Sequence, residues 1–224
     1  RDNIGKDDVL IVSIGGNDVA LMPTPCTIFS MAGLLAMPLN CIKFGKSCCV
    51  LPVNDCCCGC GPSLCSCAGS CPPCLGYFRH LFQVRVQKYV EMLTSKTKPK
   101  KILVCMIYYL DESPESPSWA GTALRAMGYN QNPAQLQTFI KKVFEEATCQ
   151  IKIQGSEVVP VPLFNVLDGQ NPGDYVARVE PSASGGKKMA EYLLDVIDDP
   201  SIVHNDGVQS SYASPSTHLI PGRW

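Results

Sequence analysis

Two short polar segments, far apart in the chain, carry residue types that suit carbonyl and proton-transfer chemistry. Gly15-Gly16-Asn17-Asp18 follows an apolar run, and Glu180-Pro181-Ser182 precedes a helical pattern near the C-terminus. An amide donor such as Asn17, held at the end of a strand, stabilises negative charge that develops on a carbonyl oxygen. The first segment also suits an ordinary turn, because Gly and Asn tolerate positive φ.

The hydrophobic pattern indicates the strands that position these segments. Apolar, β-branched runs at residues 8–14, 101–110 and 157–164 predict strands, and the first run is typical of a strand buried on both faces. The third run contains Pro160 and Pro162, which favour an edge or a short strand. Buried runs of this kind predict a parallel sheet.

Three amphipathic helices are predicted between and after these strands. They cover residues 76–94, residues 132–147 with Asn132 as cap and Pro133 at the first position, and residues 184–198. In the last helix the expected inward residues are Met189, Ala190, Leu193, Leu194 and Ile197. Alternating strands and helices predict a doubly wound α/β fold, in which ligands bind beyond the carboxyl ends of the strands.

The two polar segments, in this order, resemble blocks III and V of the SGNH (GDSL-type) hydrolases, which read G-x-N-D and D-x-x-H-P-x-x-x-G. The resemblance implies a flavodoxin-like, three-layer α/β/α sandwich that hydrolyses esters with a Ser nucleophile and a His base. It also implies that Asn17 supplies the side-chain amide of the oxyanion hole, with Gly15, Gly16 and Asp18 supporting its loop. Over most of its length the chain also resembles a loosely defined subgroup from eukaryotic microbes, in which the Arg-Val-Glu-Pro-Ser phrase and a Cys-rich insertion recur.

The sequence departs from the family pattern in three places. Blocks I and II, with the nucleophile and the Gly of the oxyanion hole, would lie before Arg1, together with the N-terminal strand or strands. Glu180 stands at the position of the catalytic His, and Ala177 at that of the orienting Asp. A carboxylate accepts a serine proton effectively only when its pKa is raised toward neutrality. Glu180 therefore has a structural alternative, in which it bonds its own turn or the helix that follows.

Further pocket candidates are Asp174, Tyr108, Tyr109 and His80. Asp174 is the nearest acid before position 177, and the two tyrosines end the second apolar run. His80 lies early in the first predicted helix. Each also has a structural alternative: Asp174 as a loop acid, the two tyrosines as core or rim packing, and His80 as a surface or packing residue.

Cysteine is strongly clustered: eleven of the fourteen lie between Cys41 and Cys74. Three interpretations stay open: a disulfide framework, with Cys26 as a further partner, a thiolate metal cluster, or S-acylation beside the apolar stretch 27–42, which suits an interfacial anchor. Cys105 and Cys149 are expected to be core residues. The metal cluster would use Cys56, Cys58, Cys60, Cys65 and Cys67.

The leading prediction is an N-terminally incomplete SGNH-like ester hydrolase over residues 1–200, with a Cys-rich insertion at 22–75 and a flexible tail at 201–224. Its substrate would be a small-molecule or lipid ester, with no cofactor and with peripheral membrane contact through the insertion. The alternatives are an inactive binding or membrane-associated module and a metal-binding protein. A net charge of −1 argues against a nucleic-acid partner. Clustered cysteine favours a secretory, extracellular or membrane-associated location, although the location stays open.

Overall fold

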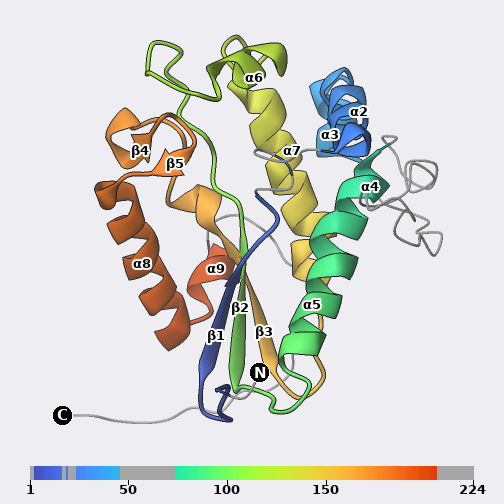
Figure 1. Ribbon diagram of the computed structural model, residues 1–224, viewed down its shortest axis with the longest axis vertical. Helices are drawn as coiled ribbons and strands as arrows, with labels where there is room; N and C mark the ends of the chain where they lie inside the picture. Colours follow the sequence, from blue (N-terminus) through green and yellow to red (C-terminus); the bar gives the residue numbers. More distant parts are fainter. Residues whose placement is uncertain (1–2, 17–18, 20–23, 46–73, 206–224) are drawn as a thin grey trace.

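A parallel three-stranded sheet forms the centre of the molecule (Figure 1). The computed structural model describes residues 3–16, 19, 24–45 and 74–205. Strands β1 (Val9–Ser13), β2 (Lys101–Met106) and β3 (Glu157–Pro162) lie in the order β1-β2-β3, with β2 in the middle. The predicted α/β class with a parallel sheet is therefore confirmed.

Strand β2 is buried along its whole length because helices cover both faces of the sheet. Ile102 and Val104 point to one face, where they pack with Val86 and Val90 of helix α5 (Val86–Leu93). Leu103 and Cys105 point to the other face, beside α8 (Ala183–Asp198) and α9 (Ile202–Asn205). The alternation of β2 side chains thus builds two separate cores.

The first of these faces is extended toward the carboxyl end of the sheet by a larger apolar cluster. Helix α4 (Leu75–Arg79), the π-helical segment η2 (His80–Arg85) and α5 follow one another as one rod, and α7 (Pro133–Glu146) lies beside it. The predicted helices over 76–94 and 132–147 are therefore confirmed, although the side chain of Asn132 makes no capping hydrogen bond.

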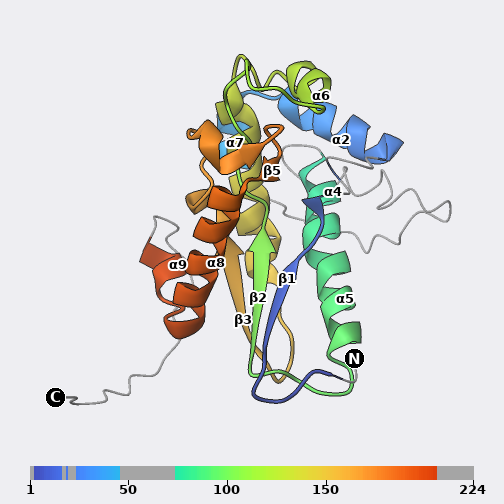
Figure 2. The same ribbon diagram turned by 60° about the vertical axis from the view of Figure 1, so that its left-hand side comes forward.

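Short elements gather at the carboxyl end of the strands (Figure 2). They include a small antiparallel hairpin of β4 (Tyr175–Val176) and β5 (Glu180–Pro181), in which Tyr175 pairs with Pro181. The helices at this end are α2 (Pro25–Leu35), α3 (Leu39–Lys43) and α6 (Gly121–Ala126). The remaining short elements of the described residues are η3 (Thr148–Gln150), which follows α7, η4 (Leu163–Asn165), which follows β3, and η5 (Pro172–Asp174), which precedes β4. None of the helices in the described ranges is long and apolar enough to cross a membrane.

The structure differs in part from the expected burial and order at three places. Strand β1 is not buried on both faces: Ile11 is 45% exposed, because within the described residues β1 pairs only with β2. In helix α8, Met189, Leu193 and Ile197 pack against the core as predicted, but Ala190 and Leu194 are exposed, Leu194 to 62%, and Val196 is buried instead. The expected tail begins too early, because α9 packs Val203 into the core; residues 206–224 lie outside the described residues.

Candidate functional site

A pocket of about 460 Å³ lies at the carboxyl ends of β1 and β2. Its floor and walls come from the strand ends, from α7 and from the loop that carries α6. Most of the lining is apolar, and Glu180 is the acidic side chain among the described lining residues. An apolar cavity with few polar groups is the usual form of a small-molecule site. The lining includes Ser13, Gly15, Gly16, Phe82, Tyr108 and Glu180.

A side chain would not fit at position 15, which is occupied by a glycine. Its φ is +98°, and a β-carbon there would lie 2.8 Å from Cε1 of the Phe82 ring. Phe82 is held in that place by η2, a π-helical turn of the kind that often occurs at functional sites. The glycine therefore lets the chain leave β1 along the pocket wall. Asn17 and Asp18, which come next, lie outside the described residues.

A strained turn in the hairpin presents Glu180 to the pocket. Ala177 and Arg178, between β4 and β5, both have positive φ, at 50° and 68°. Such backbone costs a non-glycine residue about 1–3 kcal/mol and persists only where surrounding contacts enforce it. Glu180 follows this turn, is exposed, and receives no hydrogen bond from a described residue. Within the described part of the chain, the structural alternative for Glu180, a bond to its own turn, is not observed.

The contacts that enforce the turn come from Arg178, which is only 1% exposed. Its Nε and Nη2 donate to the backbone carbonyl of Asp111 at 3.1 and 3.0 Å, and its Nη1 donates to Oδ1 of Asn130 at 3.0 Å. In return, the Asp111 amide donates to the Arg178 carbonyl. Hydrogen bonds from a charged group are about twice as strong as neutral ones. Arg178 thus fastens the hairpin to the loop after β2.

Tyr108 is the aromatic side chain that lies beside Glu180. Its hydroxyl donates to the carbonyl of Val179 at 2.9 Å. Burial, and next the negative charge of Glu180, raise the pKa of Tyr108 to about 12. The phenol is therefore a neutral hydrogen-bond donor at physiological pH.

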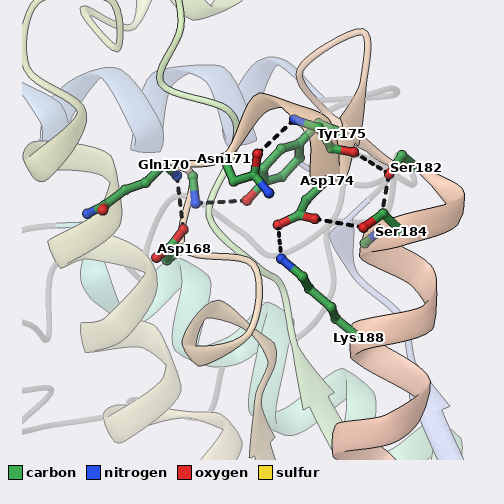
Figure 3. Close-up of polar contacts among 11 residues, drawn as sticks. Asp168, Gln170, Asn171, Asp174, Tyr175, Ser182, Ser184 and Lys188 are labelled. Atoms are coloured by element: carbon green, nitrogen blue, oxygen red, sulfur yellow. Dashed lines mark hydrogen bonds and ion pairs between the residues drawn. The ribbon is translucent and has the colours of Figure 1, made fainter.

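Asp174 holds the start of α8 rather than facing the pocket (Figure 3). Its carboxylate accepts from Lys188 Nζ at 2.6 Å and from Ser184 Oγ at 3.2 Å, and the hydrogen bond from Lys188 lowers its pKa. A β-carbon at Gly185 would collide with the backbone carbonyl of Asp174. This close approach, with the Ser182 side chain capping the helix, fixes how α8 begins.

Two other predicted pocket residues belong to the packing. Tyr109 stacks on Phe164 with ring centroids 5.1 Å apart, and His80 is 4% exposed in η2; neither lines the pocket. Asp174, Tyr109 and His80 therefore lie outside the lining of this pocket, and their part in a site stays a prediction. Cys105 is buried and Cys149 packs against the core, as expected, and burial raises the pKa of both thiols to about 12.

The Cys-rich segment cannot be compared with its three interpretations. The proposed ligands Cys56, Cys58, Cys60, Cys65 and Cys67 lie outside the described residues. The part of the chain that the structure describes contains no cluster of three or more His, Cys, Asp or Glu side chains suited to a metal ion. The thiolate cluster stays a prediction.

Three residues of the site were not among the predicted site residues. Arg178 belongs to the Arg-Val-Glu-Pro-Ser phrase, and it is among the largest fully buried side chains of the described residues. Ser13 and Trp119 also line the pocket: Ser13 lies at the carboxyl end of the first predicted strand, and Trp119 lies in the loop after the second. A buried arginine beside a pocket-facing carboxylate leaves no periodic signal, because its partners come from segments distant in sequence.

The site therefore combines an apolar cavity with one carboxylate and one phenol at the ends of parallel strands. A carboxylate that no described residue bonds can accept a proton or bind a donor on a ligand. Gly15, Gly16 and Glu180, from the two segments that the sequence singles out, line the same cavity. In the comparisons with known proteins, the chain matches no family model, no curated protein and no solved structure.

Proposed function

We propose that the protein is an ester hydrolase of the SGNH type, with its substrate in the pocket at the carboxyl ends of β1 and β2. One observation carries this proposal: the chain leaving β1 and the chain entering α8 reach the same cavity, lined by Gly16 and Glu180. These are the segments that resemble blocks III and V. The parallel sheet and the helices on both of its faces are also what a three-layer α/β/α sandwich requires.

The apolar lining suits the acyl part of an ester, which is drawn from water by its hydrocarbon surface. A hydroxyl nucleophile would attack the carbonyl carbon and pass its proton to Glu180. The oxyanion that forms would accept a hydrogen bond from the Asn17 amide. The proton then goes to the leaving alcohol, and water releases the acid from the acyl-enzyme. The family's nucleophile stands in a Gly-Asp-Ser block that residues 1–224 do not contain, so the proposal requires this block elsewhere in the complete gene product.

The proposal is tested on the complete gene product with a fluorophosphonate probe and with p-nitrophenyl ester turnover. We expect labelling of one serine, and we expect Asn17→Ala to lower kcat about 100-fold or more. Glu180→Gln removes the proton acceptor and should lower kcat by a similar or larger factor. Glu191→Gln, at an exposed site on α8, is the matched control and should leave turnover unchanged. An unlabelled protein, or equal loss in the control, contradicts the proposal.

A second candidate is a binding module of the same fold without hydrolysis. It is favoured by one specific observation: Asp174, the acid nearest to the expected orienting position, is bound to Lys188 and Ser184 instead of facing the pocket. Saturable binding of a non-hydrolysable ester analogue, weakened by a pocket-filling change and accompanied by no turnover, would establish this module instead.

A further inference from the structure

Helix α2 buries both of its hydroxyl residues and exposes two of its large apolar ones. Thr27, Ser30, Met31 and Leu34 form its buried face. On the opposite side, Ile28 is 57% and Phe29 is 63% exposed, and the other exposed positions of the helix are Pro25 and Ala32. Surface helices of globular proteins normally show the reverse pattern, with polar residues outward. The outer face of α2 therefore has the composition of a contact surface.

The inward face of α2 is fixed by specific bonds, so the helix is not simply rotated. Thr27 Oγ1 and Tyr77 Oη are hydrogen-bonded at 2.7 Å in the buried interior, and Thr24 caps the helix through the Thr27 amide. From α7, the Gln135 amide donates to the carbonyl of Met37 at 2.6 Å, just beyond the end of α2. Turning Ile28 and Phe29 inward would break these bonds. Their exposure is a property of the fold.

Helix α3 and the residue after it expose further apolar side chains. Leu39 is 38% exposed and Phe44 is 72% exposed. Residues 24–45 contain no acidic residue, and their single charge is Lys43, whose ammonium lies 5.7 Å from the centre of the Phe44 ring. We call Ile28, Phe29, Leu39 and Phe44, with Lys43, the α2–α3 surface. Both helices lie at the carboxyl end of the sheet, and α2 extends outward from the body (Figure 2).

We propose that the α2–α3 surface binds a lipid surface, with α2 lying in the interfacial plane of a bilayer. Aromatic and aliphatic side chains beside a basic residue are typical of such interfacial helices. A helix of 11 residues is about 16 Å long, which is too short to cross a hydrocarbon core of about 30 Å. The absence of carboxylates in residues 24–45 leaves no group in this stretch that anionic headgroups would repel.

Lipid is favoured over a protein partner by the lack of polar groups on α2. Protein interfaces are surrounded by a hydrogen-bonding rim, with about one hydrogen bond per 100–200 Å². The exposed residues of α2, Pro25, Ile28, Phe29 and Ala32, have no side chain that donates or accepts a hydrogen bond, whereas α3 exposes Asn40 and Lys43. A hydrocarbon phase needs no such group from α2.

Helix α2 also connects this surface to the pocket, because Met31 on its buried face lines the cavity. An apolar ligand that partitions into the bilayer would thus reach the pocket from the side that touches lipid. Membrane binding itself requires no hydrolysis, so this inference stands or fails independently of the proposed function.

The test is flotation of the full chain with phosphatidylcholine vesicles, with and without phosphatidylserine. We expect the protein to float with both, and the double variant Ile28→Ser/Phe29→Ser to bind at least tenfold more weakly. Leu194→Ser is the matched control, since Leu194 is equally exposed but lies on α8, and it should float like the parent protein. Lys43→Gln should remove about fivefold of the binding to the phosphatidylserine vesicles and leave the binding to phosphatidylcholine unchanged.

Several results would overturn this proposal. The first is that the parent protein does not float with the vesicles. The second is that the double variant floats as well as the parent, while its circular dichroism and urea midpoint show that both are equally folded. Loss of floating after hydroxylamine treatment, which removes thioester-linked acyl groups, would assign the binding to acylated cysteines instead. A dimer in light scattering that the double variant dissociates, without vesicle binding by the parent, would assign the surface to a second copy of the chain.

Discussion

The hydroxyl of Tyr108 donates a 2.9 Å hydrogen bond to the carbonyl of Val179, the residue before Glu180. This bond joins the end of the central strand to the hairpin across 71 positions of sequence. It places the phenol and the carboxylate on the same wall of the pocket. The electrostatic effect of Glu180 on Tyr108 follows from that placement.

Tyr108 should remain protonated far into the alkaline range. Its pKa is raised to about 12, whereas an unfolded tyrosine titrates near 10. Because the folded state keeps the proton more tightly, its contribution to stability is complete below about pH 10 and disappears as the pH rises toward 12. Absorbance at the tyrosinate band will check this: Tyr108→Phe should remove one group from the late phase. If Tyr108→Phe instead removes a group that titrates near pH 10, Tyr108 is not buried as described.

Gly15→Ala should destabilise the fold by about 2–5 kcal/mol. The left-handed backbone costs about 1–2 kcal/mol for any other residue, and displacing the Phe82 ring adds about 1–3 kcal/mol. Gly128→Ala separates the two causes, because Gly128 also has positive φ but no atom within 4 Å of its would-be β-carbon. Urea unfolding of both variants measures the difference. Equal losses would show that Phe82 moves aside without cost.

Arg178→Lys should cost about 2–4 kcal/mol of folding free energy. Lysine cannot donate twice to the Asp111 carbonyl while also reaching Asn130, and its ammonium would remain buried without matched partners. The control is Arg125→Lys on the exposed side of α6, which should change stability by less than about 0.5 kcal/mol. Chemical denaturation compares them. A tolerated lysine at position 178 would mean that the hairpin is held by other contacts.

Asp174→Asn should remove part of the acid sensitivity of folding. The hydrogen bond from Lys188 lowers the pKa of Asp174, so its stabilisation is present above the unfolded value of about 3.9 and is lost as the pH falls below it. At neutral pH the variant should be less stable by about 1–3 kcal/mol, and the two proteins should converge at low pH. Urea midpoints between neutral and acid pH test this. Asp195→Asn, on the exposed side of α8, should show no such convergence.

The elements that can be predicted from the amino-acid sequence are those whose burial is complete or whose apolar stripe is long. Strand β2 lies within an apolar run, and every one of its residues is buried. The stripe of Leu136, Phe139, Ile140 and Val143 predicted α7, and all four are buried. Local periodicity is sufficient here because the whole repeat faces one core.

The rotation of α8 and the environment of the acidic residues depend on contacts between segments that are distant in sequence. Leu194 continues an apolar stripe in sequence, yet it is exposed, because the carbonyl of Asp174 packs against Gly185 and so fixes which side of the helix faces inward. In the segment that runs from η5 through the β4–β5 hairpin, Asp174 is bonded to Lys188, whereas Glu180 lines the pocket. Whether a carboxylate is bonded or open depends on which distant segments surround it.

The burial of Arg178 and the exposure of Phe29 have the same physical origin. A sequence pattern assigns charged residues to solvent and apolar residues to the core, since that is where their transfer free energies place them on average. Arg178 is buried because backbone carbonyl and amide oxygens from other segments meet its donors. Phe29 is exposed because hydrogen-bonded Thr27 occupies the inner side of α2. Both exceptions require partners that only the folded chain brings together.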